Sequence, residues 1–147
     1  MKDIARSAIV EHSDAEMYAL VERVEAYPDF LPWCRAAQVL ERAPGLTVAT
    51  LSVGVRGLAY EFTTENANRP PAAIDLQLRE GPFRHFEARW RFQALGADAC
   101  RVEYAMRYAF SGALISRALA PLAASIADTL VDAFRRRADA VYGAAAR

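Results

Sequence analysis

The sequence has few of the residues that carry most enzyme chemistry. Its 147 residues include two cysteines, Cys34 and Cys100, and two histidines, His12 and His85. The cysteines form no CxxC pair and no set of four or six, which argues against a zinc site or a disulfide framework and favours a reducing compartment. No HExxH, GxSxG, P-loop or GxGxxG motif occurs. We therefore expect no catalytic residue and no metal site, although the absences alone leave cyclase chemistry open.

A net charge and long apolar runs are absent as well. Eighteen basic residues balance eighteen acidic ones, so the chain has no global attraction to nucleic acid or anionic lipid, and we expect no DNA partner. No run reaches the roughly 18 apolar residues of a membrane-spanning helix, and residues 1–10 lack the apolar core of a signal peptide. These patterns predict a cytoplasmic protein that forms one domain over residues 1–147.

The few candidate bases and nucleophiles have ordinary interpretations. His12 ends a predicted strand and His85 falls on the outward side of another, so we expect both at the surface. Cys34 precedes Arg35, and a nearby cation can lower the pKa of a thiol, but a semi-buried cysteine is the simpler interpretation. Cys100 falls on the inward side of its strand and is expected in the core.

The sequence does contain a clear helix start near its beginning. Ser13 and Glu16 have the spacing of a capping box, and apolar residues at helical spacing then predict a helix over residues 14–25. Two prolines follow, so only a short helical turn is expected within residues 27–33.

The middle of the chain alternates apolar and polar residues with a period of two. Such patterning, with one polar face, predicts an antiparallel sheet. The residues Phe86, Ala88, Trp90 and Phe92 are one inward-facing set. The seven predicted strands cover residues 4–11, 36–41, 49–56, 58–65, 74–79, 86–93 and 100–110.

The last segment has the period of a helix. Its apolar positions are Ile115, Leu119, Leu122, Ile126, Leu130, Phe134, Ala138 and Val141. This spacing predicts one helix of about thirty residues, interrupted or kinked at Pro121. The run Arg135–Arg137 near its end is interpreted as a solvated face rather than a binding patch.

These elements predict a cavity. Seven strands span roughly 29 Å, whereas a helix with its side chains is about 10–12 Å across. The sheet must therefore curl around the helix, and the space between them holds either packed aromatic side chains or an apolar ligand. We expect the phenol groups of Tyr60, Tyr104 and Tyr108 to be the polar groups of this otherwise apolar cavity. The predicted ligand-binding residues are Phe30, Trp33, Val53, Tyr60, Phe62, Leu76, Phe83, Trp90, Phe92, Tyr104, Met106, Ile126, Leu130 and Phe134.

Several strings resemble one known family. They are VEAYPDFLPWC at residues 24–34, GPFR at 81–84, WRF at 90–92 and CRVE at 100–103. Over residues 3–143 the chain is similar to the START-like family that holds the coenzyme Q-binding proteins, the bacterial ribosome association toxin and proteins labelled polyketide cyclases. The resemblance implies an α+β helix-grip fold of the START/Bet v 1 type, in which a curved seven-stranded antiparallel sheet surrounds a long C-terminal helix.

The resemblance also implies functions, and three hypotheses remain open. The first is binding of a ubiquinone-like lipid, without a covalent cofactor, in support of respiratory electron transport. The second is binding to the large ribosomal subunit, which blocks subunit joining and for which the outward arginines are the candidate contacts. The third is a polyketide cyclase or aromatase, for which Arg79, on the outward side of its strand, is a further candidate beside the phenols. The outward arginines are Arg56, Arg84, Arg89, Arg91, Arg101 and Arg107.

The loop with Phe30, Leu31 and Trp33 has two interpretations. Pro28 and Pro32 stiffen it, so its apolar side chains either form the rim of the cavity or plug one end of the core. A rim would allow transient contact with a membrane and a location peripheral to the inner membrane.

Overall fold

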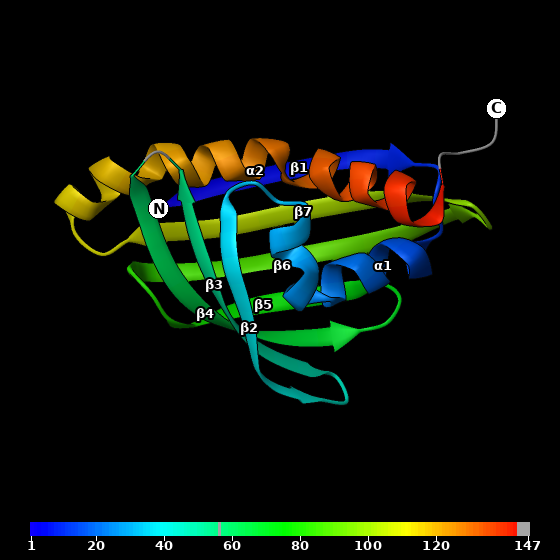
Figure 1. Ribbon diagram of the computed structural model, residues 1–147, viewed down its shortest axis with the longest axis horizontal. Coiled ribbons are helices and arrows are strands. Elements are labelled where there is room, and N and C mark those ends of the chain that lie inside the picture. Colours follow the sequence, from blue (N-terminus) through cyan, green and yellow to red (C-terminus); the bar gives the residue numbers. More distant parts are fainter. Residues whose placement is uncertain (56, 144–147) are drawn as a thin grey trace.

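One sheet and one long helix make up most of the molecule (Figure 1). The computed structural model describes residues 1–55 and 57–143. The elements in chain order are β1 Lys2–Val10, α1 Asp14–Glu22, the 3-10 helix η1 Val24–Asp29, β2 Cys34–Ala43, β3 Leu46–Val55, β4 Leu58–Arg69, β5 Ala73–Glu80, β6 Phe83–Gly96, β7 Ala99–Phe110 and α2 Ala113–Tyr142.

The sheet has seven strands in the order β1-β7-β6-β5-β4-β3-β2, and neighbouring strands pair in antiparallel fashion. In Figure 1, β2, β3 and β4 turn away from the direction of β1, β7 and β6, so the sheet curves around α2. The fold is therefore the predicted α+β helix-grip fold. It arises because the period-two pattern gives each strand one apolar side that only a helix inside the curve can cover.

The start of α1 follows the predicted capping box. The Ser13 hydroxyl accepts a hydrogen bond from the Glu16 backbone N–H (3.1 Å), and the Ser13 backbone N–H donates to Glu16 Oε1 (3.0 Å). The helix ends at Glu22, earlier than the predicted residue 25, because η1 begins at Val24. The short helical turn expected within residues 27–33 thus lies at residues 24–29 and contains Pro28.

Helix α2 is a single helix of 30 residues. It runs through Pro121 without the predicted interruption. Its buried side packs against the sheet through residues that include Ala127, Phe134 and Ala138. Although the sequence has no unbroken apolar run, an 18-residue window of α2 has a mean hydropathy of 1.4, which makes α2 long and apolar enough to cross a membrane by length and composition; 33% of this window is buried within the protein.

One irregularity in the sheet affects the core. A register shift between Phe83 and His85 adds a residue to β6 where it pairs with β7. Because of this bulge, Phe83 and Phe86 are both buried, although their spacing would place them on opposite faces of a regular strand.

Candidate ligand cavity

A cavity of about 90 Å³ lies between the concave face of the sheet and α2. Strands β3 to β7, the segment from η1 to Trp33, and the middle of α2 supply its walls. The lining residues are Val24, Tyr27, Trp33, Ala49, Leu51, Val53, Tyr60, Phe62, Thr64, Asn66, Leu76, Phe83, Phe86, Trp90, Tyr104, Met106, Tyr108, Ala123, Ile126, Leu130 and Phe134. None of them is charged, so the cavity favours an uncharged, apolar occupant.

Most of the residues predicted from the sequence surround this cavity, but Phe30 and Phe92 do not. The Phe30 ring packs edge-on against Phe134, with ring centroids 5.2 Å apart, and the Arg137 guanidinium lies over the Phe30 ring, 5.0 Å from its centroid. Phe92 stacks on Trp90 and meets the edge of Tyr18, so it packs beneath α1. The alternation along a strand predicts which face of the sheet a side chain lies on. It does not predict which other element packs against that side chain.

The loop after η1 packs into the core, and its Trp33 also lines the cavity. Leu31 is 1% exposed and Trp33 is 9% exposed. These side chains therefore do not form an exposed lip, and the membrane contact suggested for this loop loses its support.

Aromatic side chains fill much of the trough inside the sheet. Phe83 stacks on Phe110 with centroids 4.6 Å apart and contacts the rings of Tyr60, Phe62 and Phe86. At this end of the trough the aromatic residues are therefore packed core, as one of the two interpretations predicts. The cavity is what remains between this aromatic cluster, Trp90 and α2.

The tyrosines in the cavity wall stay neutral at ordinary pH. Burial raises the pKa of Tyr27, Tyr60 and Tyr104 well above the usual range of a phenol. The Tyr104 hydroxyl donates to Met106 Sδ (3.2 Å), and the Tyr27 hydroxyl donates to the Val21 carbonyl. Neutral phenols can form hydrogen bonds with a ligand, but they provide no charged acid or base for catalysis.

Two polar residues of the cavity wall were missed by the sequence interpretation. Thr64 and Asn66 are 5% and 6% exposed and line the cavity, and the Thr64 hydroxyl donates to Asn66 Oδ1 (2.7 Å). The signal was present, because extending the inward alternation of Tyr60 and Phe62 by four residues reaches both.

The cysteine thiols lie outside the cavity lining and are protonated. Burial raises the pKa of the Cys34 thiol to about 11, and the thiol donates to the Ala36 carbonyl (3.5 Å). Burial likewise raises the pKa of Cys100 to about 11. The neighbouring Arg35 thus does not activate Cys34, and the simpler interpretation of a buried cysteine describes both residues.

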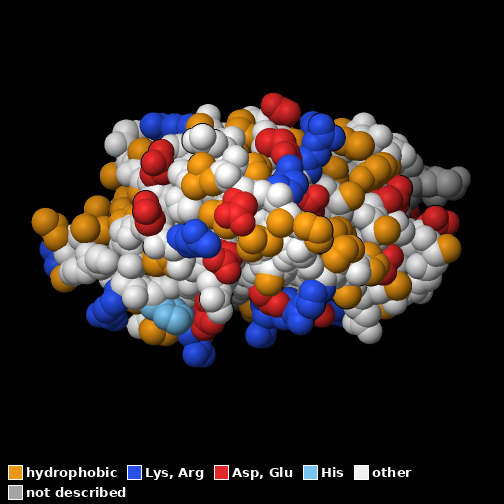
Figure 2. Space-filling view, turned by 90° about the horizontal axis from the view of Figure 1, so that it is seen from below, with side chains coloured by type: hydrophobic (Ala, Val, Ile, Leu, Met, Phe, Trp, Pro, Cys, Tyr) orange, Lys and Arg blue, Asp and Glu red, His pale blue; other side chains and the backbone are white. Residues whose placement is uncertain are grey.

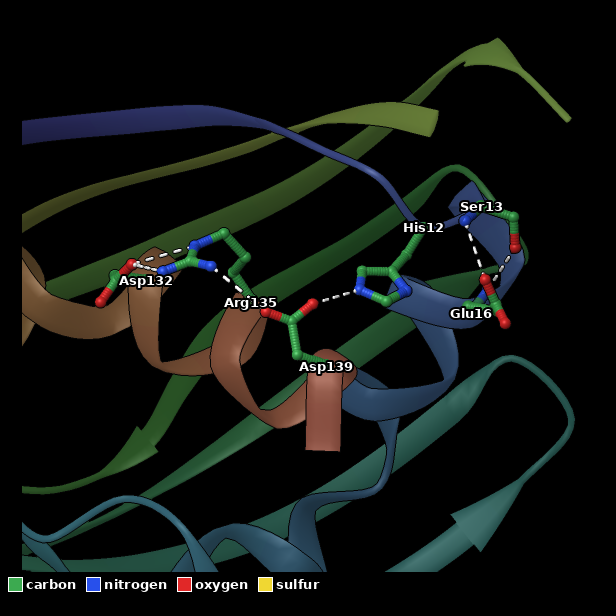
Figure 3. A network of polar contacts seen from close by, with 6 residues as sticks. All are labelled: His12, Ser13, Glu16, Asp132, Arg135 and Asp139. Atoms are coloured by element: carbon green, nitrogen blue, oxygen red, sulfur yellow. Dashed lines mark hydrogen bonds and ion pairs between the residues drawn. The ribbon is translucent and has the colours of Figure 1, made fainter. Parts of the chain in front are cut away.

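The expectation that His12 lies at the surface is wrong. Its ring is 4% exposed, and Nε2 lies 2.7 Å from Asp139 Oδ1 near the end of α2 (Figure 3). Arg135 continues the network by contacting both Asp139 and Asp132. The network joins the β1–α1 connection to α2, so it fixes the position of this end of the helix. His85 is half-exposed, as predicted.

Acidic and basic side chains alternate on the surface. Arg91 pairs with Asp75 (2.8 Å) and Arg107 pairs with Asp3 (2.7 Å). Arg79 also points outward, where its guanidinium pairs with Glu65 (2.6 Å), which removes it from any cavity chemistry. Figure 2 shows both charge types interspersed on one face, without a field of one sign.

Four predicted outward arginines remain besides Arg91 and Arg107. Arg84 and Arg89 are exposed and Arg101 is half-exposed. Arg56 lies outside the described residues. In the run Arg135–Arg137, the first two guanidiniums pair with Asp132, which agrees with a solvated face.

Both the sequence and the fold are similar to those of known proteins. The family described as polyketide cyclase / dehydrase and lipid transport matches residues 10–135. The chain is 41% identical, over 95% of its length and 97% of the relative, to the ribosome association toxin RatA of Pseudomonas aeruginosa. It is 27% identical, over 96% of its length and 59% of the relative, to the mitochondrial coenzyme Q-binding protein COQ10 homolog B of Xenopus laevis. The crystal structure of an aromatase/cyclase from Streptomyces sp. R1128 has the same fold, with a TM-score of 0.81, 18% identity and coverage of 98% of this chain and 99% of that one.

Proposed function

Because the chain belongs to the polyketide cyclase / dehydrase and lipid transport family, we propose that it binds an uncharged, ring-bearing apolar molecule of the ubiquinone class between the sheet and α2. The uncharged, aromatic-rich cavity carries this proposal. In its wall, the ring centroids of Trp90 and Phe134 lie 5.2 Å apart, and both rings provide flat apolar surfaces. Rings bind such surfaces through dispersion and offset or edge-on contacts.

The size of the cavity limits how a ligand enters. An apolar cavity of about 150 Å³ holds benzene, so the 90 Å³ found here admits a substituted ring only when the wall moves. We expect this movement at an exposed apolar rim at one end of the molecule, where Leu114 and Ile115 in the first turn of α2 are 80% and 40% exposed, and Val55 and Leu58 of the β3–β4 hairpin are 40% and 42% exposed. Figure 1 places this hairpin beside the first turns of α2, and β4 contacts α2. Hydrophobic side chains face solvent at this end in Figure 2.

The cavity wall supports binding rather than catalysis. It holds no carboxylate, histidine, cysteine or arginine among the lining residues, and its phenols are neutral. A cyclase needs an acid or base within hydrogen-bond reach of its substrate. Lack of turnover on poly-β-keto substrates would agree with this view, whereas steady turnover would overturn it.

Lipid extraction and mass spectrometry of protein purified from its own cells test the proposal directly. We expect a co-purifying quinone, or saturable uptake of added ubiquinone by lipid-free protein. Ala123→Leu places a larger side chain in the cavity wall and should abolish uptake, whereas Ala140→Leu makes the same change on the exposed side of α2 and should leave it intact. Protein that neither carries nor takes up quinone contradicts the proposal.

A separate observation favours a second function, association with the ribosome. The relative named ribosome association toxin is 41% identical over nearly the whole of both chains, a closer match than the 27% identity to the coenzyme Q-binding relative. Sequence similarity therefore favours the ribosome as partner, while the cavity favours an apolar ligand, and one protein can do both. A ribosomal role would place the protein in the cytoplasm.

Sucrose gradients test the ribosomal role. Added protein should co-sediment with the large subunit and lower the yield of joined ribosomes when the two subunits are mixed. Because the net charge is zero, binding should depend on individual arginines such as Arg89, and Arg89→Glu should weaken it more than Lys2→Glu. Unchanged subunit joining and no co-sedimentation would remove this function.

A further inference from the structure

We propose that Thr64 and Asn66 form a hydrogen-bonding end of the cavity that binds a carbonyl oxygen on the ligand ring. The inference rests on the proposed binding of an apolar ligand and deepens it, because it assigns the ligand a ketone or quinone oxygen and an orientation. Both residues are more than nine-tenths buried and line the cavity.

The hydrogen bond between the two residues sets which atoms of Asn66 remain for a ligand. The Thr64 hydroxyl donates to Asn66 Oδ1 (2.7 Å), so the carbonyl side of the amide is occupied. Within residues 1–55 and 57–143 the Nδ2 group, with two N–H donors, makes no side-chain hydrogen bond like that at Oδ1, and it is not one of the fully buried unpaired atoms, so it keeps accessible surface at the cavity wall. By contrast, Asn68, two residues further along β4, donates its Nδ2 to Thr47 Oγ1 (2.9 Å) and does not line the cavity.

An unpaired amide donor in an apolar wall selects between ligands. Burial without a hydrogen bond is costly for an N–H group. A hydrocarbon that fills the cavity covers the Nδ2 group and imposes this cost, whereas a carbonyl oxygen next to Asn66 accepts a hydrogen bond and avoids it. The site therefore discriminates between rings of equal size by the oxygen they carry.

The inward face of β4 also orients the ligand. It changes from aromatic at Tyr60 and Phe62 to polar at Thr64 and Asn66. The aromatic end adjoins the turn to β3, where Val55 and Leu58 are exposed. A ligand with its carbonyl at Asn66 thus directs an apolar tail toward the rim formed with the first turn of α2.

Two matched compounds test the inference by titration calorimetry. Duroquinone and durene carry the same tetramethylated six-membered ring, but only duroquinone has carbonyl oxygens. We expect wild-type protein to bind duroquinone about tenfold more tightly than durene, the ratio that one good hydrogen bond provides. Asn66→Leu should remove this preference while durene still binds, and the control Asn68→Leu should retain it.

The outcomes separate this inference from the function on which it rests. Equal affinity for the two compounds in wild-type protein, or a preference that survives Asn66→Leu, overturns the carbonyl site and leaves apolar binding standing. Failure to bind either compound overturns both. If Asn66→Leu does not fold, Thr64→Val supplies the second variant, because loss of the hydroxyl frees the amide to rotate and should reduce the preference for duroquinone.

Discussion

Cys34 and Cys100 show how burial governs single residues in this protein. Burial raises both thiol pKa values from about 9 to about 11. The fold favours the neutral thiol, so this contribution to stability is complete below pH 9 and is lost as the pH rises through 11. At pH 8 the thiolate fraction should be about a hundredfold lower in the folded than in the unfolded chain.

Alkylation with iodoacetamide at pH 8 measures this difference, because the thiolate is the reactive form. Both cysteines should react about a hundredfold more slowly in native protein than in guanidinium. Native labelling within a few-fold of the unfolded rate would contradict the burial of these thiols.

His12 owes its role to a partner that lies far away in sequence. Its Nε2 contacts Asp139 at 2.7 Å, and its ring is buried. His12→Ala removes this contact and leaves a void, so it should lower the free energy of unfolding by about 2 kcal/mol. His85→Ala, at a half-exposed position, should change it by less than about 0.5 kcal/mol. Urea unfolding of the two variants checks this, and equal effects would show that the His12 network contributes nothing.

At the scale of elements, the sequence predicts those helices and strands that are set by hydrophobic periodicity and by helix capping. The seven strands and the start of α1 follow from the alternation and from Ser13 with Glu16, because these signals lie within a few residues. The bulge at Phe83 and the buried site of His12 could not be predicted, because each depends on pairing with β7 or α2. Thr64 and Asn66 could have been placed inward by parity, but their hydrogen bond could not.

The β5–β6 turn depends on a glycine that approaches the cavity wall. Gly81 has φ +150°, and a Cβ on it would lie 2.7 Å from the Phe62 Cβ. Gly81→Ala should therefore destabilise the protein by about 1–2 kcal/mol and displace Phe62. Gly96→Ala is the matched control, because a Cβ there meets nothing within 4 Å. Thermal unfolding should show a lower midpoint for Gly81→Ala alone; equal midpoints would contradict the close approach.

At the scale of the whole molecule, the comparison of sheet width with helix diameter predicts the right architecture but overstates the free space. The sheet curves around α2, as Figure 1 shows. The volume of the side chains does not follow from strand spacing, and the cluster around Phe83 reduces the cavity to about 90 Å³. The proposed binding of a ring therefore requires movement of the wall. Because a ligand that binds only the folded state raises its stability, tight ligands should also raise the unfolding midpoint.

Tryptophan fluorescence tests the central claim, that a ring enters between the sheet and α2. The chain has two tryptophans, and both Trp33 and Trp90 line the cavity, so a quinone inside it lies against the only indole rings. Titration with a short-chain ubiquinone should quench the emission saturably at one equivalent. The quenching should vanish in Ala123→Leu and persist in Ala140→Leu. Emission that falls only linearly with added quinone, and equally in all three proteins, would show that the cavity takes no ligand.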